Sequence, residues 1–158
     1  MAEKTNVIRC LEQKGIPFQV HNYIPTGAVS GAEAASALSQ SPDRVFKTLV
    51  CVGRTGAHYV FVVPVSGELD LKKAARSCGE KYVEMVKSKE LLPLTGYVHG
   101  GCSPIGMKKL FKTAVDESAL EFETIFLSAG RIGHQVELSP LALESVIPLT
   151  FEDLRACP

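Results

Sequence analysis

The sequence predicts an α+β fold, in which helices of modest length pack on a mixed β-sheet. Several short strand patterns are joined by tight turns, and helices do not follow nearly every strand as they would in a doubly wound parallel fold. The 158 residues are 46% hydrophobic and 22% charged, which is a globular composition at the length of one domain. We therefore expect residues 1–158 to form a single domain.

Helix and strand signals alternate over the first forty residues. Thr5 and Gly15 bound an amphipathic helical pattern, because threonine caps a helix start and glycine favours its end. Residues 18–23 then alternate as a strand. Ser30 and Glu33 have the spacing of a capping box, so a second helix is expected over residues 30–38.

Residues 45–52 read as a strand that is buried on both faces and yet carries a lysine. Lys47 shares one face with apolar neighbours, and the opposite face is apolar as well. Removing an ammonium from water without a partner costs several kcal/mol, so we expect Lys47 to reach a cleft, a carboxylate or a ligand. A glycine-rich turn leads to a second strand over residues 58–65, which completes a hairpin whose pairing Pro64 is expected to end.

The alternation of elements continues to the C-terminus. A helix is expected between Asp70 as its cap and Gly79 as its stop. Ser139 and Pro140 open another helix, and Thr150 is expected to cap a last short one. The remaining predicted strands are residues 82–86, 111–115, 124–129 and 134–139.

Charge and cysteine usage narrow the class of protein. Seventeen basic and seventeen acidic side chains cancel, so any contact with RNA must come from a local patch or a partner protein. No apolar run approaches the ~20 residues of a membrane span, and we expect a cytoplasmic protein. The cysteines and histidines lack metal-ligand spacing, so we expect reduced thiols and neither a metal nor a cofactor.

The segment Gly100–Gly106, GGCSPIG, is the most unusual loop. Its glycines let the backbone approach a ligand closely, and Pro104 stiffens the turn, so successive amides can form a hollow for an oxyanion. A simple turn between strands explains the same glycine content. Cys102 could be a nucleophile with His99 nearby, but no cysteine-enzyme signature surrounds it, and a small loop side chain is the favoured interpretation.

A second glycine pair occurs in SAGRIGHQVEL, where Gly130 and Gly133 flank Arg131. Alone, this segment predicts a hairpin with a solvated arginine in its turn.

Four segments taken together resemble the YbaK family of bacterial aminoacyl-tRNA deacylases. They are VFKTLV, VSGELDLKKAA, TGYVHGGCSPIG and SAGRIGHQVELSP, in this order over almost the whole chain. The family is similar to the editing domain of bacterial prolyl-tRNA synthetase. The resemblance implies a single α+β domain around a mixed, partly closed sheet, and an enzyme that removes cysteine mischarged onto proline tRNA or carried by cysteine tRNA.

The resemblance also implies a set of site residues. Lys47 falls on the functional lysine of the family, and the amides of Gly100 and Gly101 match those near the scissile carbonyl. Two positions depart from the family pattern: Ser30 stands about where an aromatic is usual, and Gln135 replaces an aspartate. The substrate-binding residues implied are Tyr23, Ser30, Thr48, Ser103, Pro104, Gly130 and Gln135.

No protein nucleophile paired with a general base is visible, which shapes the expected mechanism. In the family, the thiol of the substrate cysteine attacks its own ester carbonyl, and the protein orients the groups and stabilises charge. Mischarged tRNA is then the substrate and prolyl-tRNA synthetase the implied partner. Two alternatives stay open: a Schiff-base enzyme that uses Lys47, and a module that binds tRNA or a synthetase without catalysis.

Overall fold

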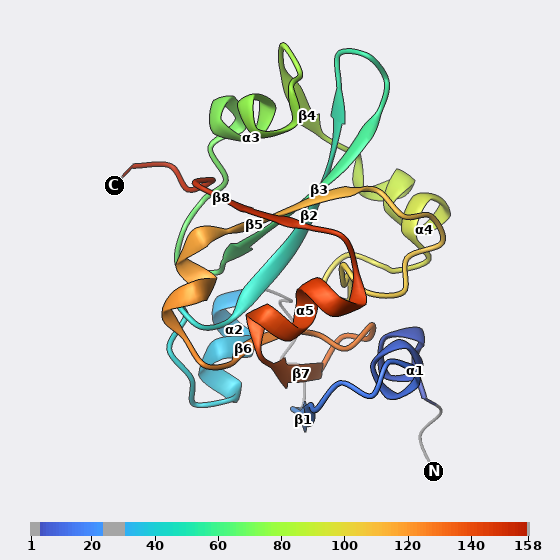
Figure 1. The fold of residues 1–158 in the computed structure, drawn as a ribbon, viewed down its shortest axis with the longest axis vertical. Helices are drawn as coiled ribbons and strands as arrows, with labels where there is room; N and C mark the ends of the chain where they lie inside the picture. The colour runs from blue at the N-terminus through green and yellow to red at the C-terminus, as the bar shows by residue number, and fades with distance from the viewer. Residues whose placement is uncertain (1–3, 24–30, 158) are drawn as a thin grey trace.

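The structure, a computed structural model, describes residues 4–23 and 31–157 of the chain (Figure 1). In this part the strands divide between two sheets. The smaller sheet is antiparallel and has the order β1 (Gln19–Asn22), β7 (His134–Leu138), β6 (Ile125–Ser128). The larger sheet has the order β4 (Val83–Met85), β2 (Phe46–Gly53), β3 (His58–Pro64), β5 (Lys112–Asp116), β8 (Thr150–Glu152).

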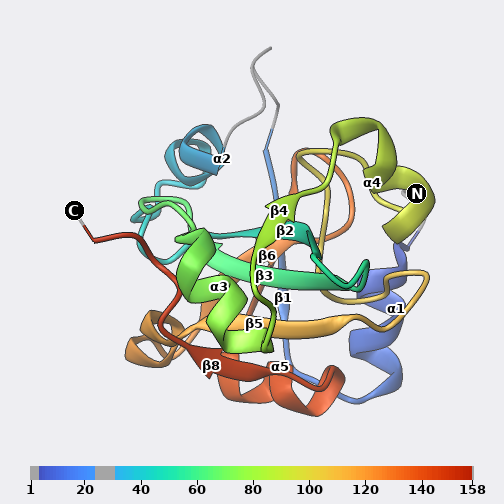
Figure 2. The same cartoon turned by 90° about the horizontal axis from the view of Figure 1, so that it is seen from above.

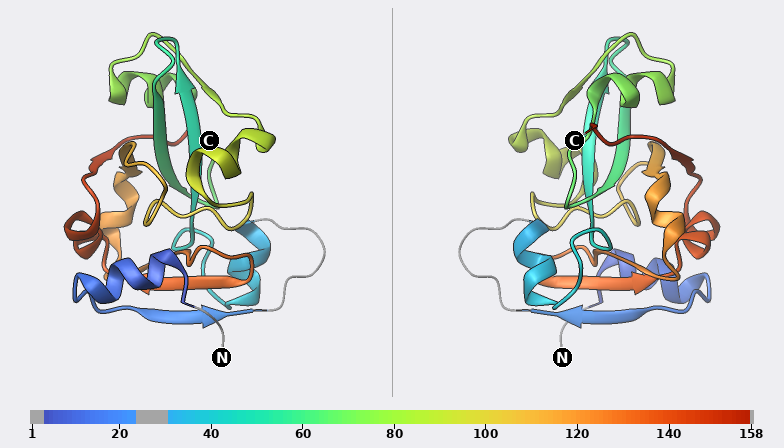
Figure 3. Two further views of the ribbon diagram at one scale, coloured as in Figure 1. Left: turned by 90° about the vertical axis from the view of Figure 1, so that its right-hand side faces the viewer. Right: turned by 90° about the vertical axis from the view of Figure 1, so that its left-hand side faces the viewer.

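The larger sheet is mixed, as the sequence predicts. β2 is antiparallel to both β3 and β4, whereas β5 is parallel to β3 and to β8. A parallel bridge between Val45 and Phe126 joins the start of β2 to β6 and links the two sheets. The long β2–β3 hairpin stands upright over β1 and β7, which run across the base (Figure 3). The α+β class with a mixed, partly closed sheet is thus confirmed.

Helices flank the sheets. Seen from above, α2 and α4 lie on opposite sides of β2 (Figure 2). The helices are α1 (Asn6–Gln13), α2 (Gly31–Ala37), α3 (Leu71–Cys78), α4 (Ser88–Thr95) and α5 (Pro140–Val146), with a 3₁₀ helix η1 (Glu117–Glu121).

The predicted helix caps form at α1 and α3, whereas Ser139 precedes α5 without a side-chain capping hydrogen bond. Thr5 Oγ1 accepts a hydrogen bond from the amide of Ile8 at 3.3 Å, and α1 begins directly after Thr5. Asp70 accepts from the amides of the first turn of α3, and Gly79 ends that helix with φ +74°. The expected cap at Ser30 lies outside the described residues.

The sequence prediction fails at three elements, one of which is the short η1, for which no helix was predicted. Thr150 begins strand β8 rather than a helix, because the chain returns from α5 to the edge of the larger sheet and pairs with β5. Tertiary pairing decides this segment, since three residues carry almost no local signal. The helix α4 was not predicted at all, and it contains Pro93, a residue that usually argues against a helix interior.

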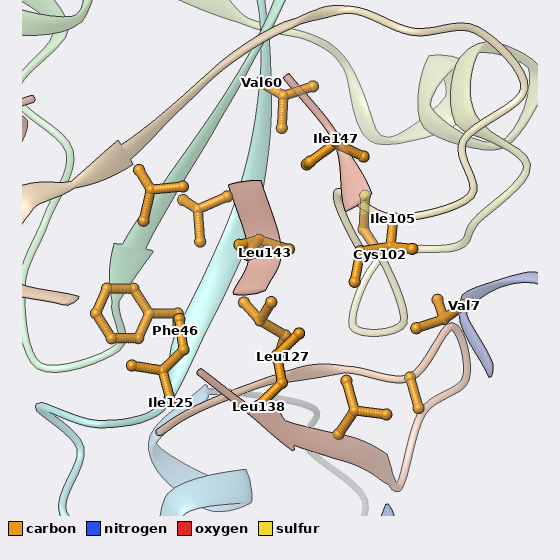
Figure 4. Packing of buried hydrophobic residues seen from close by; sticks show 14 of the residues in the cluster. Val7, Phe46, Val60, Cys102, Ile105, Ile125, Leu127, Leu138, Leu143 and Ile147 are labelled. Carbon is orange, nitrogen blue, oxygen red and sulfur yellow. The ribbon is translucent and has the colours of Figure 1, made fainter. Parts of the chain in front are cut away.

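A buried apolar cluster fills the space between the two sheets. Side chains of β6 and β7 meet those of β2 and of α5 there (Figure 4). Cys102 and Ile105 enter this cluster from the loop that follows α4, and Val7 enters it from α1. The glycine-rich loop is therefore anchored by its apolar side chains.

Arg44 fixes the junction between the sheets. Its guanidinium lies 5.1 Å from the centre of the Phe126 ring, donates to the carbonyl of Thr124 at 3.0 Å and to Glu137 at 3.2 Å. The hydroxyl of Thr124 also donates to Glu137, and this bond is the main cause of a lowered pKa of the Glu137 carboxyl. A charged network thus holds the start of β2 beside β6 and β7.

Candidate active site

A cavity of about 440 Å³ lies at the seam between the two sheets. β2 contributes the central wall, and α2, the β4–α4 segment, the glycine-rich loop and the smaller sheet supply the rest. The lining residues are Tyr23, Ala34, Val45, Phe46, Lys47, Thr48, Leu49, Val50, Val65, Met85, Val86, Ser88, Leu91, His99, Gly100, Cys102, Ser128 and Gln135.

The cavity exists because one edge of β2 is left unpaired. Hydrogen bonds from Val65 to Val45 and from Gly53 to Ala57 show that the odd-numbered residues of β2 bond towards β3. The even-numbered residues therefore present their backbone groups to the other edge. On that edge, the pairing of β6 is a parallel bridge to Val45, at the start of β2. β4 pairs with β2 from Val50 onward, where the Val50 carbonyl accepts a hydrogen bond from the Val86 amide at 3.0 Å.

Thr48 sits in the gap that this arrangement leaves. On the edge of β2 that faces away from β3, no described strand pairs between the bridge at Val45 and the bond at Val50, so the backbone N–H and C=O of Thr48 face this open edge. Its hydroxyl oxygen is buried and has no hydrogen-bond partner among the described residues. Thr48 thus offers three polar groups at the cavity, and each can serve a ligand.

Lys47 lies on the opposite face of β2 from Thr48 and lines the same cavity. Its side chain is 28% exposed, and its ammonium nitrogen is 3.7 Å from a carboxylate oxygen of Glu68, which is itself 84% exposed. Such a solvent-exposed pair is weak. Lys47 is therefore only partly buried and lines a cleft, which is one of the environments expected from the sequence. Because its ion pair is weak, its charge stays available to a ligand.

The loop at Gly100–Gly106 presents only part of its backbone to the cavity. Gly100 has φ +88° and lines the cavity, and its amide donates to no described group. The amide of Gly101 donates to the carbonyl of Val98 at 3.0 Å, so it is already engaged in a turn. The expectation that both amides face a substrate carbonyl therefore fits Gly100 and does not fit Gly101.

Ser103 and Pro104, expected to bind substrate, lie away from the lining of this cavity. Ser103 is fully buried, and its hydroxyl accepts from the amide of Ile105 at 3.3 Å. Pro104 is buried and lines a separate hollow of about 70 Å³. Their positions correspond to a role in shaping the loop, because a serine-stabilised turn and a fixed proline φ restrict the backbone.

The two glycine motifs, separate in sequence, pack against each other. A methyl group on Gly101 would lie 3.2 Å from the backbone nitrogen of Ile132 and 3.3 Å from backbone atoms of Arg131. Gly130 has φ +97°, and a methyl group there would lie 3.1 Å from the ring of Tyr97. Gly130 therefore supports the loop from outside the cavity lining rather than touching a ligand there, and the absence of side chains permits this close approach.

Tyr97 locks this packing. Its hydroxyl donates to the carbonyl of Ile105 at 2.6 Å, and burial raises the pKa of Tyr97. Gly106, with φ +76°, has room for no side chain, since a methyl group would lie 2.8 Å from the Tyr97 hydroxyl. The tyrosine thus holds the C-terminal end of the loop, at Ile105 and Gly106.

Cys102 lines the cavity but is poorly suited to nucleophilic attack. It is buried, and burial raises the pKa of its thiol to about 12. At neutral pH the thiol therefore stays protonated, and the thiolate is the nucleophilic form. His99 is exposed at the rim of the cavity. These observations favour the interpretation of Cys102 as a small loop side chain.

Of the remaining predicted residues, Tyr23 and Gln135 line the cavity, and Ser30 lies outside the described residues. Sequence reasoning missed Ser128, the strand partner of Gln135, and the α4 side of the lining. Ser128 lies in the predicted strand over residues 124–129 and in the SAG segment of the family resemblance, but no pattern singled it out as a site residue. The α4 residues could not be placed without the helix itself.

The lining has a simple chemical character. It includes one lysine, backbone amides such as those of Thr48 and Gly100, and several polar oxygen atoms, and none of the described lining residues is an aspartate or glutamate. Within residues 4–23 and 31–157, no group of three metal-ligating side chains comes together. The arrangement of the lining residues can orient an ester and stabilise developing negative charge.

Among the helices of the described residues, none has the length and apolar character needed to span a membrane.

Comparisons with known proteins identify relatives of this chain. A family model for the aminoacyl-tRNA editing domain matches residues 26–146. An Enterococcus faecalis protein named as a candidate Cys-tRNA(Pro)/Cys-tRNA(Cys) deacylase, EbsC, is 42% identical over 153 residues, covering 96% of this chain and 93% of the relative.

Two solved structures share the fold. The crystal structure of a candidate trans-editing enzyme for prolyl-tRNA synthetase has a TM-score of 0.83 at 26% identity and covers 96% of both chains. The crystal structure of a hypothetical protein has a TM-score of 0.85 at 23% identity, covering 96% of this chain and 100% of that chain.

Proposed function

The chain belongs to the family of aminoacyl-tRNA editing domains, and on this premise we propose that it is a trans-acting deacylase that removes cysteine mischarged onto proline tRNA. Cysteine tRNA carries the same ester and is the second substrate to test. The name of the Enterococcus faecalis relative includes both substrates. Such a reaction belongs to the cytoplasm, where charged tRNA is used.

The cavity at the open edge of β2 is the observation that carries this proposal. Lys47, Thr48 and Gly100 are all among its lining residues, and their ammonium and amide groups are the donors that we assign to the reaction. Hydrogen-bond donors of this kind stabilise the oxyanion that forms when an ester carbonyl is attacked. One such donor is worth roughly 3 kcal/mol of transition-state stabilisation in other enzymes.

The nucleophile in this proposal is the thiol of the esterified cysteine. Its sulfur forms a bond to the ester carbonyl carbon, and the bond from that carbon to the ribose oxygen breaks. The proton of the thiol ends on the ribose oxygen, which leaves a cysteine thiolactone and free tRNA. The absence of an aspartate or glutamate among the described lining residues supports this route, because no carboxylate is present there to act as a general base for water.

The decisive experiment is a deacylation panel with proline tRNA charged with cysteine, alanine, serine or proline, and with Cys-charged cysteine tRNA. A thiol of pKa ~8.5 offers a few per cent thiolate at neutral pH, whereas a serine hydroxyl offers essentially none. We expect release of cysteine, with thiolactone detected, and survival of the other esters. Rapid hydrolysis of the serine and alanine esters without thiolactone would instead indicate attack by water.

The two alternatives predict different results. A Schiff-base enzyme would be trapped covalently at Lys47 by borohydride in the presence of a carbonyl substrate. A non-catalytic module would bind tRNA or a synthetase and release no amino acid from any member of the panel. The fold match to a candidate trans-editing protein for prolyl-tRNA synthetase supports that synthetase as the partner that presents the tRNA.

A further inference from the structure

Gln135 is a buried polar side chain whose carbonyl oxygen is left without a hydrogen-bond partner among the described residues. It is 5% exposed and lines the cavity, and its Oε1 atom has no partner among the described residues. Burying an amide carbonyl without a donor lowers stability, so native proteins rarely leave one unpaired. The chain therefore holds an acceptor in the cavity that a ligand can satisfy.

The position of Gln135 decides which part of a ligand it meets. The exposed lining residues are on the α4 and loop side, at Met85, Ser88 and His99, whereas Gln135 and its strand partner Ser128 are buried. The terminal nucleotide of a tRNA is covalently joined to the rest of that large molecule, so it must lie towards the exposed side. The amino acid is then the group that reaches Gln135, a step that rests on the proposed function.

The donor that fits is the α-ammonium group of the amino acid. A carbonyl oxygen can only accept, and an aminoacyl ester has two donors besides the nucleotide, its α-ammonium and its thiol. The thiol is a weak donor and is needed at the ester carbonyl. We infer that Gln135 Oε1 accepts a hydrogen bond from the α-ammonium of the esterified amino acid and so positions the α-carbon.

The electrostatics of the lining make this acceptor important. Among the described lining residues, Lys47 is the one lysine, and there is no arginine, aspartate or glutamate; no carboxylate of the lining therefore offsets the charge of Lys47. A cationic ammonium entering beside Lys47 must therefore be stabilised by oriented dipoles, and a hydrogen bond to a charged donor is stronger than one between neutral groups. Because every amino acid has this group, Gln135 sets affinity and orientation rather than the choice of side chain.

The test is a double-mutant cycle between Gln135 and the α-amine. Gln135→Leu removes the acceptor, and proline tRNA charged with 3-mercaptopropionate keeps the thiol and the ester but lacks the α-amine. We expect Gln135→Leu to lower kcat/KM for the cysteinyl ester by roughly ten- to hundredfold. The same substitution should leave kcat/KM for the mercaptopropionyl ester within about twofold of the wild-type value.

Two further variants separate positioning from a structural role. Gln135→Glu keeps an acceptor of the same size and should restore most of the loss on the cysteinyl ester. Ser118→Ala is the matched control, since Ser118 Oγ is also buried without a partner but lies in η1, away from the cavity lining. Ser118→Ala should leave kcat/KM unchanged for both the cysteinyl and the mercaptopropionyl ester.

Equal losses on the two esters, or no loss with Gln135→Leu, would overturn the inference. So would a wild-type protein that cleaves both esters with equal kcat/KM, a comparison that needs no variant to fold. A wild-type protein that releases no cysteine at all would instead remove the proposed function, and the inference with it. The two failures are thereby distinguished.

Discussion

The ammonium nitrogen of Lys47 lies 3.7 Å from a carboxylate oxygen of Glu68, and the two side chains differ greatly in exposure, at 28% and 84%. The glutamate is almost free in solvent, so the pair adds little to stability. Lys47 is thus held at the cavity by its strand rather than by its partner. Because the ion pair contributes little to stability, an effect of removing Lys47 on activity can be distinguished from an effect on the fold.

We predict that Lys47→Ala abolishes deacylation and leaves the fold intact. Loss of one oriented cation near the oxyanion should lower kcat/KM at least a hundredfold, while the free energy of unfolding changes by less than about 1 kcal/mol. Single-turnover deacylation and circular dichroism measure these two effects. Glu68→Gln breaks the same ion pair and serves as the control, with activity within about twofold; a matching loss there would implicate the ion pair instead.

Gly101→Ala should reduce activity although Gly101 lies outside the cavity lining. The added methyl group would meet backbone atoms of Arg131 and Ile132 at 3.2 to 3.3 Å, so the loop must move by a few tenths of an ångström. We expect a roughly tenfold lower kcat, because misplacement of a catalytic group is costly.

Gly67→Ala is the matched control for this change. The methyl group there would meet the side chain of Arg155, with its Cδ at 3.0 Å, and a side chain can shift by a few tenths of an ångström more easily than backbone. Steady-state kinetics should show a near-normal kcat. If both alanine variants behave alike, the packing of the two glycine loops does not control the site.

Cys102→Ser should retain deacylase activity within about threefold. Burial raises the pKa of the Cys102 thiol to about 12, so it offers almost no thiolate at neutral pH. Intact-mass spectrometry during turnover should show no acyl group on the protein. An acyl adduct that maps to Cys102 would contradict this interpretation and assign the cysteine as nucleophile.

The protein should lose stability in alkaline solution through its buried thiols. Burial raises the pKa of both Cys51 and Cys102 from 9.0 to about 12. Between these values the unfolded thiols release protons that the folded ones keep, so the free energy of unfolding falls as pH rises. Each thiol contributes a slope of at most about 1.4 kcal/mol per pH unit.

Denaturant titrations from pH 8 to 11 measure this slope. Cys51→Ala and Cys102→Ala should each make it shallower, whereas Cys157→Ala, at an exposed thiol, should leave it unchanged. An identical slope in all three variants would show that other groups carry the alkaline loss.

The protein should bind free tRNA weakly, and a modest increase in salt concentration should weaken the binding further. Seventeen basic and seventeen acidic residues give a net charge of zero, so few phosphate contacts can release counterions. Titration of labelled proline tRNA at several salt concentrations, with and without prolyl-tRNA synthetase, measures the affinity and its slope. A nanomolar complex with naked tRNA that ignores salt would contradict this expectation.

Local signals were strong enough to predict most elements. Thr5, Asp70 and Gly79 act through hydrogen bonds and backbone angles within a few residues, so their helices follow from the sequence. Thr150 had no such local determinant, and its segment became a strand because β5 offered it an edge. The helix α4 was missed because Pro93 outweighed a weak local pattern.

The sequence by itself determined that Lys47 needed a special environment, because burying an ammonium group in an apolar strand without a partner costs several kcal/mol. It also determined that the glycine-rich loop at Gly100–Gly106 was unusual, and the order of four motifs carried the family resemblance. These conclusions depend on residue type and spacing, which are properties of the chain alone.

Only the tertiary structure decided how these parts form a site. The cavity lies where β6 stops pairing with β2 and β4 has not yet begun, and strand pairing is a long-range choice that no local pattern encodes. The engagement of the Gly101 amide by Val98 and the unpaired Oε1 of Gln135 depend on the same packing. Hydrogen-bond satisfaction is a property of the folded chain, because each donor finds its acceptor only after distant segments have met.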